Sequence, residues 1–100
     1  MAASKIKIIR RITFEDFGDN FKDSFLDFNE PSIRMGVAFQ QSLKNEDISI
    51  ILDYMSNEFV EGKMWNGKST VAIKATDVLD LPLSVVRKIS NFFSDPALPS

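Results

Sequence analysis

NEDISIILDYMSNEFVEG, residues 45–62, is the segment on which the predicted fold depends. Its large apolar residues recur at helical spacing; they are Ile48, Ile51, Leu52, Met55 and Phe59. Side chains at this spacing form one apolar stripe, of the width that a helix facing a protein core needs. The stretch therefore predicts a central helix that packs against the core.

Both ends of this stretch carry signals for a helix terminus. Asn45 is a favourable N-cap residue, and Glu46 and Asp47 follow it with negative charge that the helix dipole favours. Gly62 can adopt the left-handed conformation that ends many helices. The sequence thus predicts a continuous helix that begins after Asn45 and ends at Gly62.

Two further segments have helical patterns. Ser32 can cap a short helix over 33–43, in which apolar residues recur at helical spacing. Asp80, with Pro82 in the first turn, marks the start of a last helix. The apolar stripe of this last helix consists of Leu81, Val85, Ile89 and Phe92 or Phe93.

The aromatic segment 14–28 carries conflicting signals. Its phenylalanines are spaced three or four residues apart, and Thr13 with Asp16 resembles a capping box. These features predict a helix with an acidic outer face. Gly18, Asp19 and Asn20 have low helix propensity, so a turn at this point is the alternative.

Two short stretches have strand character. KIKIIRRI, residues 5–12, is rich in isoleucine, and TVAIK, residues 70–74, could pair with it. The basic residues of the first stretch would contact phosphate or an acidic partner, or form a solvated strand face, which is the simpler interpretation.

The expected fold is mainly α, an α-rich α+β chain with three to four helices and at most a small two-stranded β element. We expect residues 1–93 to form a single globular domain, and residues 94–100, SDPALPS, to form a flexible C-terminal tail.

Composition limits the classes of function. The chain of 100 residues has no cysteine and no histidine, so disulfides, thiolate metal sites and histidine-dependent catalytic triads are excluded. A net charge of -2 gives no general attraction to nucleic acid or anionic membranes. No apolar run approaches the ~20 residues of a membrane helix. We expect a cytoplasmic protein without catalytic, metal or cofactor sites and without nucleic-acid or membrane partners.

Residues 62–69, GKMWNGKS, match the pattern G-x-x-x-x-G-K-[ST] of phosphate-binding loops. In such a loop Lys68 would reach the phosphates and Ser69 would hold magnesium. The pattern has meaning only between a strand and a helix, because the helix N-terminus supplies the anion site. Here the predicted helix comes before the match and a strand-like stretch follows it. We interpret Gly62–Ser69 as a surface turn, with nucleotide binding as the less favoured alternative.

Three longer stretches together resemble a known family. They are NEPSIRMGVAFQQSL, FVEGKMWNG and ATDVLDLPLSVVRKISNFF. The arrangement, from about Phe14 to Phe93, resembles the small tail assembly chaperones of long-tailed bacteriophages. The resemblance implies a mostly helical, non-enzymatic protein that binds the tape measure protein during tail assembly, with the tail tube protein and a second copy as further partners. The alternative is another small phage protein, a connector or tail component or an adaptor.

A protein that holds a long partner chain needs apolar contact surface. Met64 and Trp65 fall in the predicted turn, where large apolar side chains are hard to bury, and Trp and Met are enriched at interfaces. Phe92 and Phe93 are adjacent on the last helix, so one of them must point away from its stripe. We expect these four residues to bind the partner; the alternative is that Met64 and Trp65 fold back onto the core.

Overall fold

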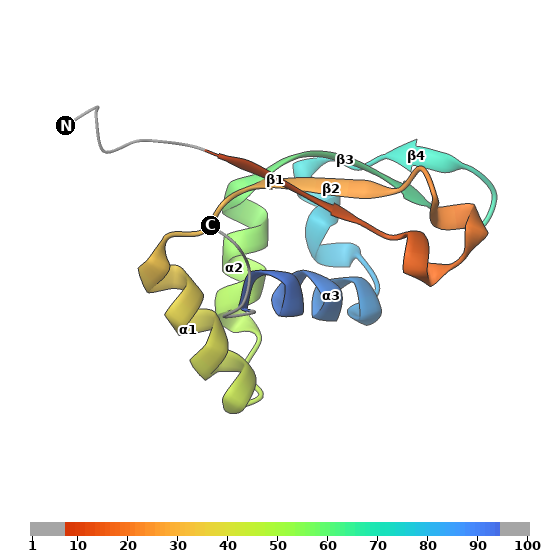
Figure 1. The fold of residues 1–100 in the computed structure, drawn as a ribbon. Coiled ribbons are helices and arrows are strands. Elements are labelled where there is room, and N and C mark those ends of the chain that lie inside the picture. The colour runs from red at the N-terminus through yellow and green to blue at the C-terminus, as the bar shows by residue number, and fades with distance from the viewer. Residues whose placement is uncertain (1–7, 95–100) are drawn as a thin grey trace.

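The structure, a computed structural model, describes residues 8–94 and combines a four-stranded antiparallel sheet with helices on one of its faces (Figure 1). The strands follow one another across the sheet in chain order: β1 (Ile9–Thr13), β2 (Phe25–Asn29), β3 (Phe59–Trp65) and β4 (Thr70–Ala72). The helices are α1 (Ile33–Lys44), α2 (Ser49–Glu58) and α3 (Leu83–Ser94). Short 3-10 helices complete the connections: η2 (Glu15–Phe17), η3 (Asp19–Phe21) and η4 (Ala75–Asp80).

The core lies between the sheet and the helices. Ile12, Leu26 and Phe28 enter it from the strands, and Phe39, Ile51, Met55 and Ile89 enter it from the helices. Phe28 is fully buried. The centroid of its ring lies 5.9 Å from the ring centroid of Tyr54, 5.6 Å from that of Phe59 and 6.0 Å from that of Phe93. These rings come from α2, β3 and α3, so Phe28 is the point at which the sheet and two helices meet.

Tyr54 fastens α2 to the sheet. Its hydroxyl donates a hydrogen bond to the backbone carbonyl of Asn29 at the end of β2. Burial raises the pKa of Tyr54 above its ordinary value, because the phenolate would lose its hydration in the core. The neutral phenol is therefore the form that the fold holds.

The prediction of a mainly α chain with at most two strands is wrong, because the structure contains a four-stranded sheet. The predicted pairing of the N-terminal strand with the stretch 70–74 is also wrong, since β1 and β4 lie at opposite edges with β2 and β3 between them. Of the predicted strand 5–12 and the predicted tail 94–100, residues 5–7 and 95–100 lie outside the described residues.

The aromatic segment 14–28 is not a helix. It forms η2, η3 and then β2, with a break at Gly18, where φ is +133°. Phe14, Phe17 and Phe21 still contact one another in series, with ring centroids 5.3 and 5.5 Å apart. A 3-10 turn places residues three apart on the same side, so Phe14 and Phe17 meet as they would on a helix. Phe21 reaches Phe17 from the following turn, η3.

The central helix is shorter than predicted. Asn45 ends α1 instead of capping α2, and α2 runs only from Ser49 to Glu58 before the chain enters β3 at Phe59. Gly62 is a buried strand residue and not a helix end. A Cβ atom there would lie 2.6 Å from Leu26 Cδ2 and 2.6 Å from the carbonyl oxygen of Phe25. The close approach of β2 and β3 is what requires glycine.

The two flanking helices are present, but the last one begins later than predicted. α3 starts at Leu83, whereas Asp80, the predicted N-cap, is the last residue of η4 and Leu81 follows it outside the helix. Ser32 caps α1, because its hydroxyl accepts a hydrogen bond from the backbone N–H of Met35 at 3.1 Å. Pro82 immediately precedes α3, a position at which a backbone N–H would have no partner within the helix, so proline costs no hydrogen bond. Both helices pack against each other beneath the sheet.

Candidate functional site

A groove of about 430 Å³ opens on the helical side of the molecule. Its walls are the end of α1, the turn into α2 and the part of α3 from Leu83 to Asn91. Apolar side chains line much of it, with Val86 buried at 5% exposure and Ile48 and Leu83 exposed at 39% and 55%. Leu43 completes the apolar lining, while Glu46 and Arg87 add opposite charges. We call this feature the α1–α3 groove.

Local hydrogen bonds hold the turn that presents Ile48. Asp47 accepts hydrogen bonds from the backbone N–H and the hydroxyl of Ser49, at 3.0 and 2.8 Å, and these bonds lower the pKa of Asp47. The hydroxyl of Ser42 donates to the backbone carbonyl of Asp47 from the other side. Glu46 has a φ of 58°, which reverses the chain direction at this point. These hydrogen bonds fix the turn and so hold Ile48 at the edge of the groove.

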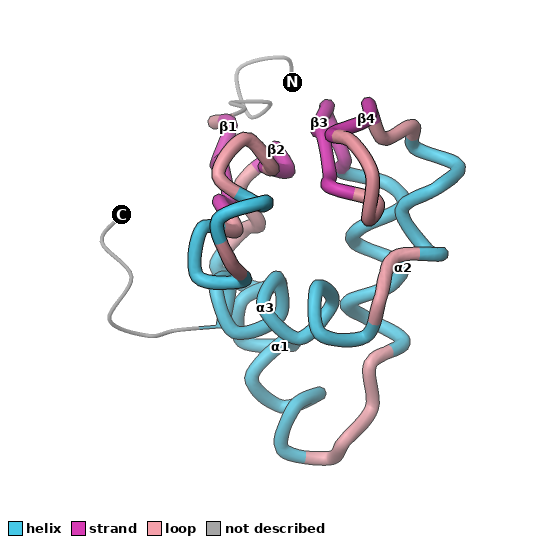
Figure 2. Tube along the Cα trace, turned by 90° about the vertical axis from the view of Figure 1, so that its right-hand side faces the viewer, coloured by secondary structure: helices cyan, strands magenta, loops and turns pink. Residues whose placement is uncertain are grey.

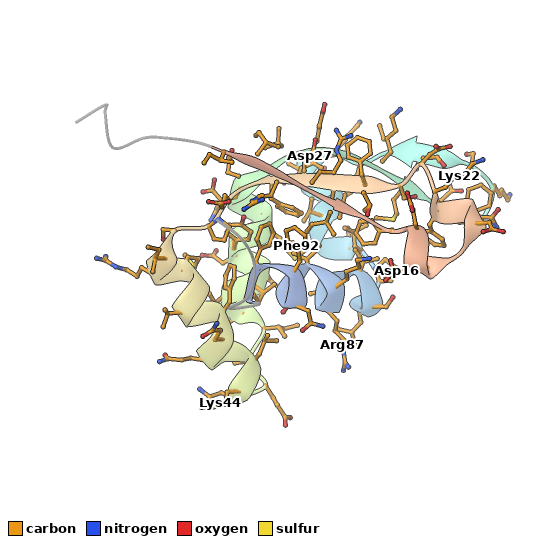
Figure 3. All side chains as sticks on the ribbon, viewed as in Figure 1. Asp16, Lys22, Asp27, Lys44, Arg87 and Phe92 are labelled. Atoms are coloured by element: carbon orange, nitrogen blue, oxygen red, sulfur yellow. The ribbon has the colours of Figure 1, made fainter. Side chains whose placement is uncertain are left out.

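The opposite face of the sheet carries a polar and aromatic cluster. Arg11 donates to both carboxylate oxygens of Asp27, at 2.8 and 3.0 Å, and its guanidinium lies 3.8 Å from the ring centroid of Phe25. The bond to Asp27 raises the pKa of Arg11. Figure 3 shows Asp27 on the side of the sheet that faces away from the helices. No described helix covers this face, as Figure 1 shows.

A second hollow, of about 490 Å³, lies beside this cluster. Its lining includes Lys22 and Lys63 as well as Arg11, together with the acidic residue Asp23. Arg11 is already paired with Asp27. The charges that remain are those of the two lysines, and Asp23 offsets one of them. The hollow is polar and open, and its lining keeps a net positive charge.

The four predicted partner-binding residues do not form one exposed surface. Met64 and Phe93 are buried, each 5% exposed, and belong to the core. Trp65 and Phe92 are half-buried. Trp65 ends β3, and its backbone N–H donates to the hydroxyl of Ser24 at 2.9 Å. Phe92 packs 5.0 Å from Phe93, and Figure 3 shows it on the side of α3 that faces the sheet.

The stretch Gly62–Ser69 spans the end of β3 and a hairpin. The backbone N–H of Asn66 donates to the carbonyl of Ser69 at 3.0 Å, and the side-chain oxygen of Asn66 accepts from the N–H groups of Lys68 and Ser69. β4 begins directly afterwards, at Thr70. A phosphate-binding loop needs a helix N-terminus at this position, and a strand occupies it instead.

Among residues 8–94, no group of three or more acidic side chains is placed to hold a metal ion. No helix in the same range is long and apolar enough to cross a membrane.

Comparisons with protein-family models, curated proteins and solved structures gave no match. The resemblance to phage tail assembly chaperones therefore rests on the sequence stretches alone.

Sequence reasoning missed the α1–α3 groove. The apolar spacing places Ile48 in the buried stripe of the central helix, yet this residue precedes the helix and is exposed. A signal is present in the last helix, where Leu83 and Val86 lie three residues apart and outside the stripe predicted from Leu81. Two apolar stripes on one helix indicate a second contact surface.

Proposed function

We propose that this chain is a non-enzymatic protein-binding domain, and most concretely a tail assembly chaperone that holds the tape measure protein in the cytoplasm of a bacterial host. The resemblance of the stretches between Phe14 and Phe93 to phage tail assembly chaperones supports this specific role. The resemblance implied a mostly helical fold, but the chain contains a four-stranded sheet. The fold therefore gives no support to the tail assembly chaperone in particular.

The α1–α3 groove is the observation that carries protein binding. A chaperone must hold a long chain without locking it, because the chain is later released into the tail. Many modest contacts with exposed apolar side chains suit this task better than one deep pocket. Leu83 and Ile48 are exposed at the mouth of the groove, and Val86 forms part of its lining. An amphipathic helix of the partner would lay its apolar stripe there.

Co-expression with the cognate tape measure protein tests the proposal. The wild-type chain is expected to keep the partner soluble, and Leu83→Glu is expected to reduce the soluble fraction by introducing a charge into the groove. Leu83 is the first residue of α3, where a carboxylate is compatible with the helix dipole, so the fold should be unchanged.

Ile33→Glu is the matched control. Ile33 is 89% exposed at the start of α1 and does not line the groove, so this variant should hold the partner as well as the wild type does. A partner that stays insoluble with the wild-type chain would contradict the chaperone function. Equal solubility with Leu83→Glu would contradict the groove. A loss with Trp65→Ala alone would move the surface to the end of β3.

A further inference from the structure

β1 is an edge strand whose outer side no strand among residues 8–94 occupies. Figure 2 shows it at the margin of the sheet, with β2 as its inner neighbour. Apart from β2, no described element has more than marginal contact with β1. The other edge strand, β4, has only three residues, which is one of the ways that proteins keep an edge from pairing. β1 has five residues and lacks that protection.

The register of β1 and β2 determines which backbone groups of β1 are already used. The N–H of Glu30 donates to the carbonyl of Ile8 at 2.7 Å, and these two residues lie directly opposite each other when the register is continued by one pair. In an antiparallel ladder, hydrogen-bonded pairs alternate with non-hydrogen-bonded pairs. Arg10 and Ile12 therefore turn their backbone groups toward β2.

The intervening residues Ile9, Arg11 and Thr13 turn their backbone N–H and C=O groups to the open edge. A row of donors and acceptors at this spacing is complementary to an extended polypeptide strand. Ile8 and Ile9, exposed at 52% and 49%, add apolar side chains beside this row. The edge thus offers both the backbone bonds and the side-chain contact that an added strand uses.

The charge of the β1 edge indicates which side chains an added strand would carry. Among residues 8–13, which the structure describes, the charged residues are Arg10 and Arg11, and both are basic. Arg10 and Arg11 each bond an acidic residue of the chain itself, Glu30 and Asp27. Even so, the Arg11 side chain is 54% exposed. A carboxylate on an added strand would lie beside it as a favourable cross-strand pair.

The same charges disfavour a second copy of this chain as the occupant. An antiparallel pair of β1 strands centred on Arg10 or on Arg11 would place that arginine opposite its own copy. Like charges directly opposite each other destabilise a strand pair. Basic residues on an edge strand are a known means of preventing self-pairing.

We propose that the β1 edge binds an extended acidic segment of another protein, which adds to the sheet as a fifth strand beside Ile9–Thr13. Its backbone bonds the outward groups of Ile9, Arg11 and Thr13, and its acidic side chains neighbour Arg11. This inference is independent of the tail assembly role and of the α1–α3 groove.

The probe is a synthetic peptide of about ten residues, the upper end of ordinary strand length, in which glutamate alternates with valine and threonine. Nuclear magnetic resonance of the isotope-labelled protein is expected to show slower amide exchange at Ile9, Arg11 and Thr13 when the peptide binds. A peptide of the same pattern with lysine in place of glutamate should bind at least about tenfold more weakly, because it opposes the basic edge.

Ile9→Pro removes one outward N–H and is expected to weaken binding by about tenfold. Ile9 is the first residue of β1, a position at which strands tolerate proline, and its N–H does not face β2. Ile9→Thr is the matched control, since it keeps the N–H and should change affinity by less than about threefold. Thr13→Pro tests the other end of the edge if Ile9→Pro fails to fold.

Any of four results would overturn the proposal. One is the absence of peptide binding at millimolar concentration, and another is equal binding of the lysine peptide. The third is a wild-type chain that dimerises in sedimentation and becomes monomeric with Ile9→Pro, because that would assign the edge to a second copy. Protection confined to amides of other strands would also contradict it.

Discussion

Phe28→Ala is expected to lower the free energy of unfolding by about 3–5 kcal/mol, the range for truncation of a buried phenylalanine. Phe28 is fully buried, and its ring meets those of Tyr54, Phe59 and Phe93. Truncation would leave a cavity between β2, α2 and α3, and neighbouring aromatic side chains can fill such a space only in part. Denaturant unfolding followed by circular dichroism measures the change.

Ile33→Ala is the control for this experiment. Ile33 is 89% exposed on α1, so its truncation should change the free energy of unfolding by no more than about 0.5 kcal/mol. A loss of similar size in both variants would show that Phe28 has no special place in the core. A loss below about 1 kcal/mol with Phe28→Ala would contradict the burial of β2.

Gly62→Ala is expected to destabilise the fold by about 1–3 kcal/mol, although alanine is normally the better residue in a strand. The added Cβ would lie 2.6 Å from Leu26 Cδ2 and 2.6 Å from the carbonyl oxygen of Phe25. The leucine side chain can move, but the carbonyl belongs to the backbone of β2. The two strands would have to separate, which weakens the centre of the sheet.

Gly36→Ala supplies the opposite expectation. Gly36 lies within α1, its φ is not positive, and a methyl group added at its Cα would meet nothing within 4 Å apart from its chain neighbours and the backbone of its own helix. Alanine should therefore raise the free energy of unfolding by roughly 0.5–1 kcal/mol. Thermal unfolding of both variants under the same conditions gives the comparison. Stabilisation by Gly62→Ala would contradict the close approach of β2 and β3.

The helices that the sequence predicts well have an exposed side and a buried side. α1 and α3 also have recognisable starts at Ser32 and Pro82. In such elements the apolar spacing and the terminus signals agree, so local rules suffice. α2 is predicted in part, since its apolar stripe is real, but the same spacing continues into β3 at Phe59.

The two central strands escape prediction because neither has a clear alternation of apolar and polar residues. In β2 the buried residues Leu26, Asp27 and Phe28 are consecutive, since Arg11 and its neighbours cover Asp27 on the face without helices. A strand buried on both faces cannot be told from a helix by periodicity alone. In β3 the register shifts between Asp27 and Phe28 of its partner, which interrupts the alternation around Val60.

Two of the four residues expected to contact a partner, Met64 and Phe93, are buried for a related reason. The sequence places Met64 in a turn, but β3 extends to Trp65 and turns Met64 into the core. Phe93 completes the aromatic cluster around Phe28, which no local pattern could indicate because its members come from distant parts of the chain. The groove and the open edge likewise depend on tertiary arrangement, although Leu83 and the basic residues of β1 are visible in the sequence.

The strand order β1-β2-β3-β4 places β1 at an open edge and all three helices on one face. Nuclear Overhauser contacts between Hα atoms test this order directly, because Arg11 and Asp27 form a non-hydrogen-bonded pair, whose Cα atoms lie about 4.5 Å apart. We predict a strong Hα–Hα contact between Arg11 and Asp27. Contacts from Arg11 to residues of β4, such as Val71, without one to Asp27 would contradict the fold and close the edge that the inferred partner strand occupies.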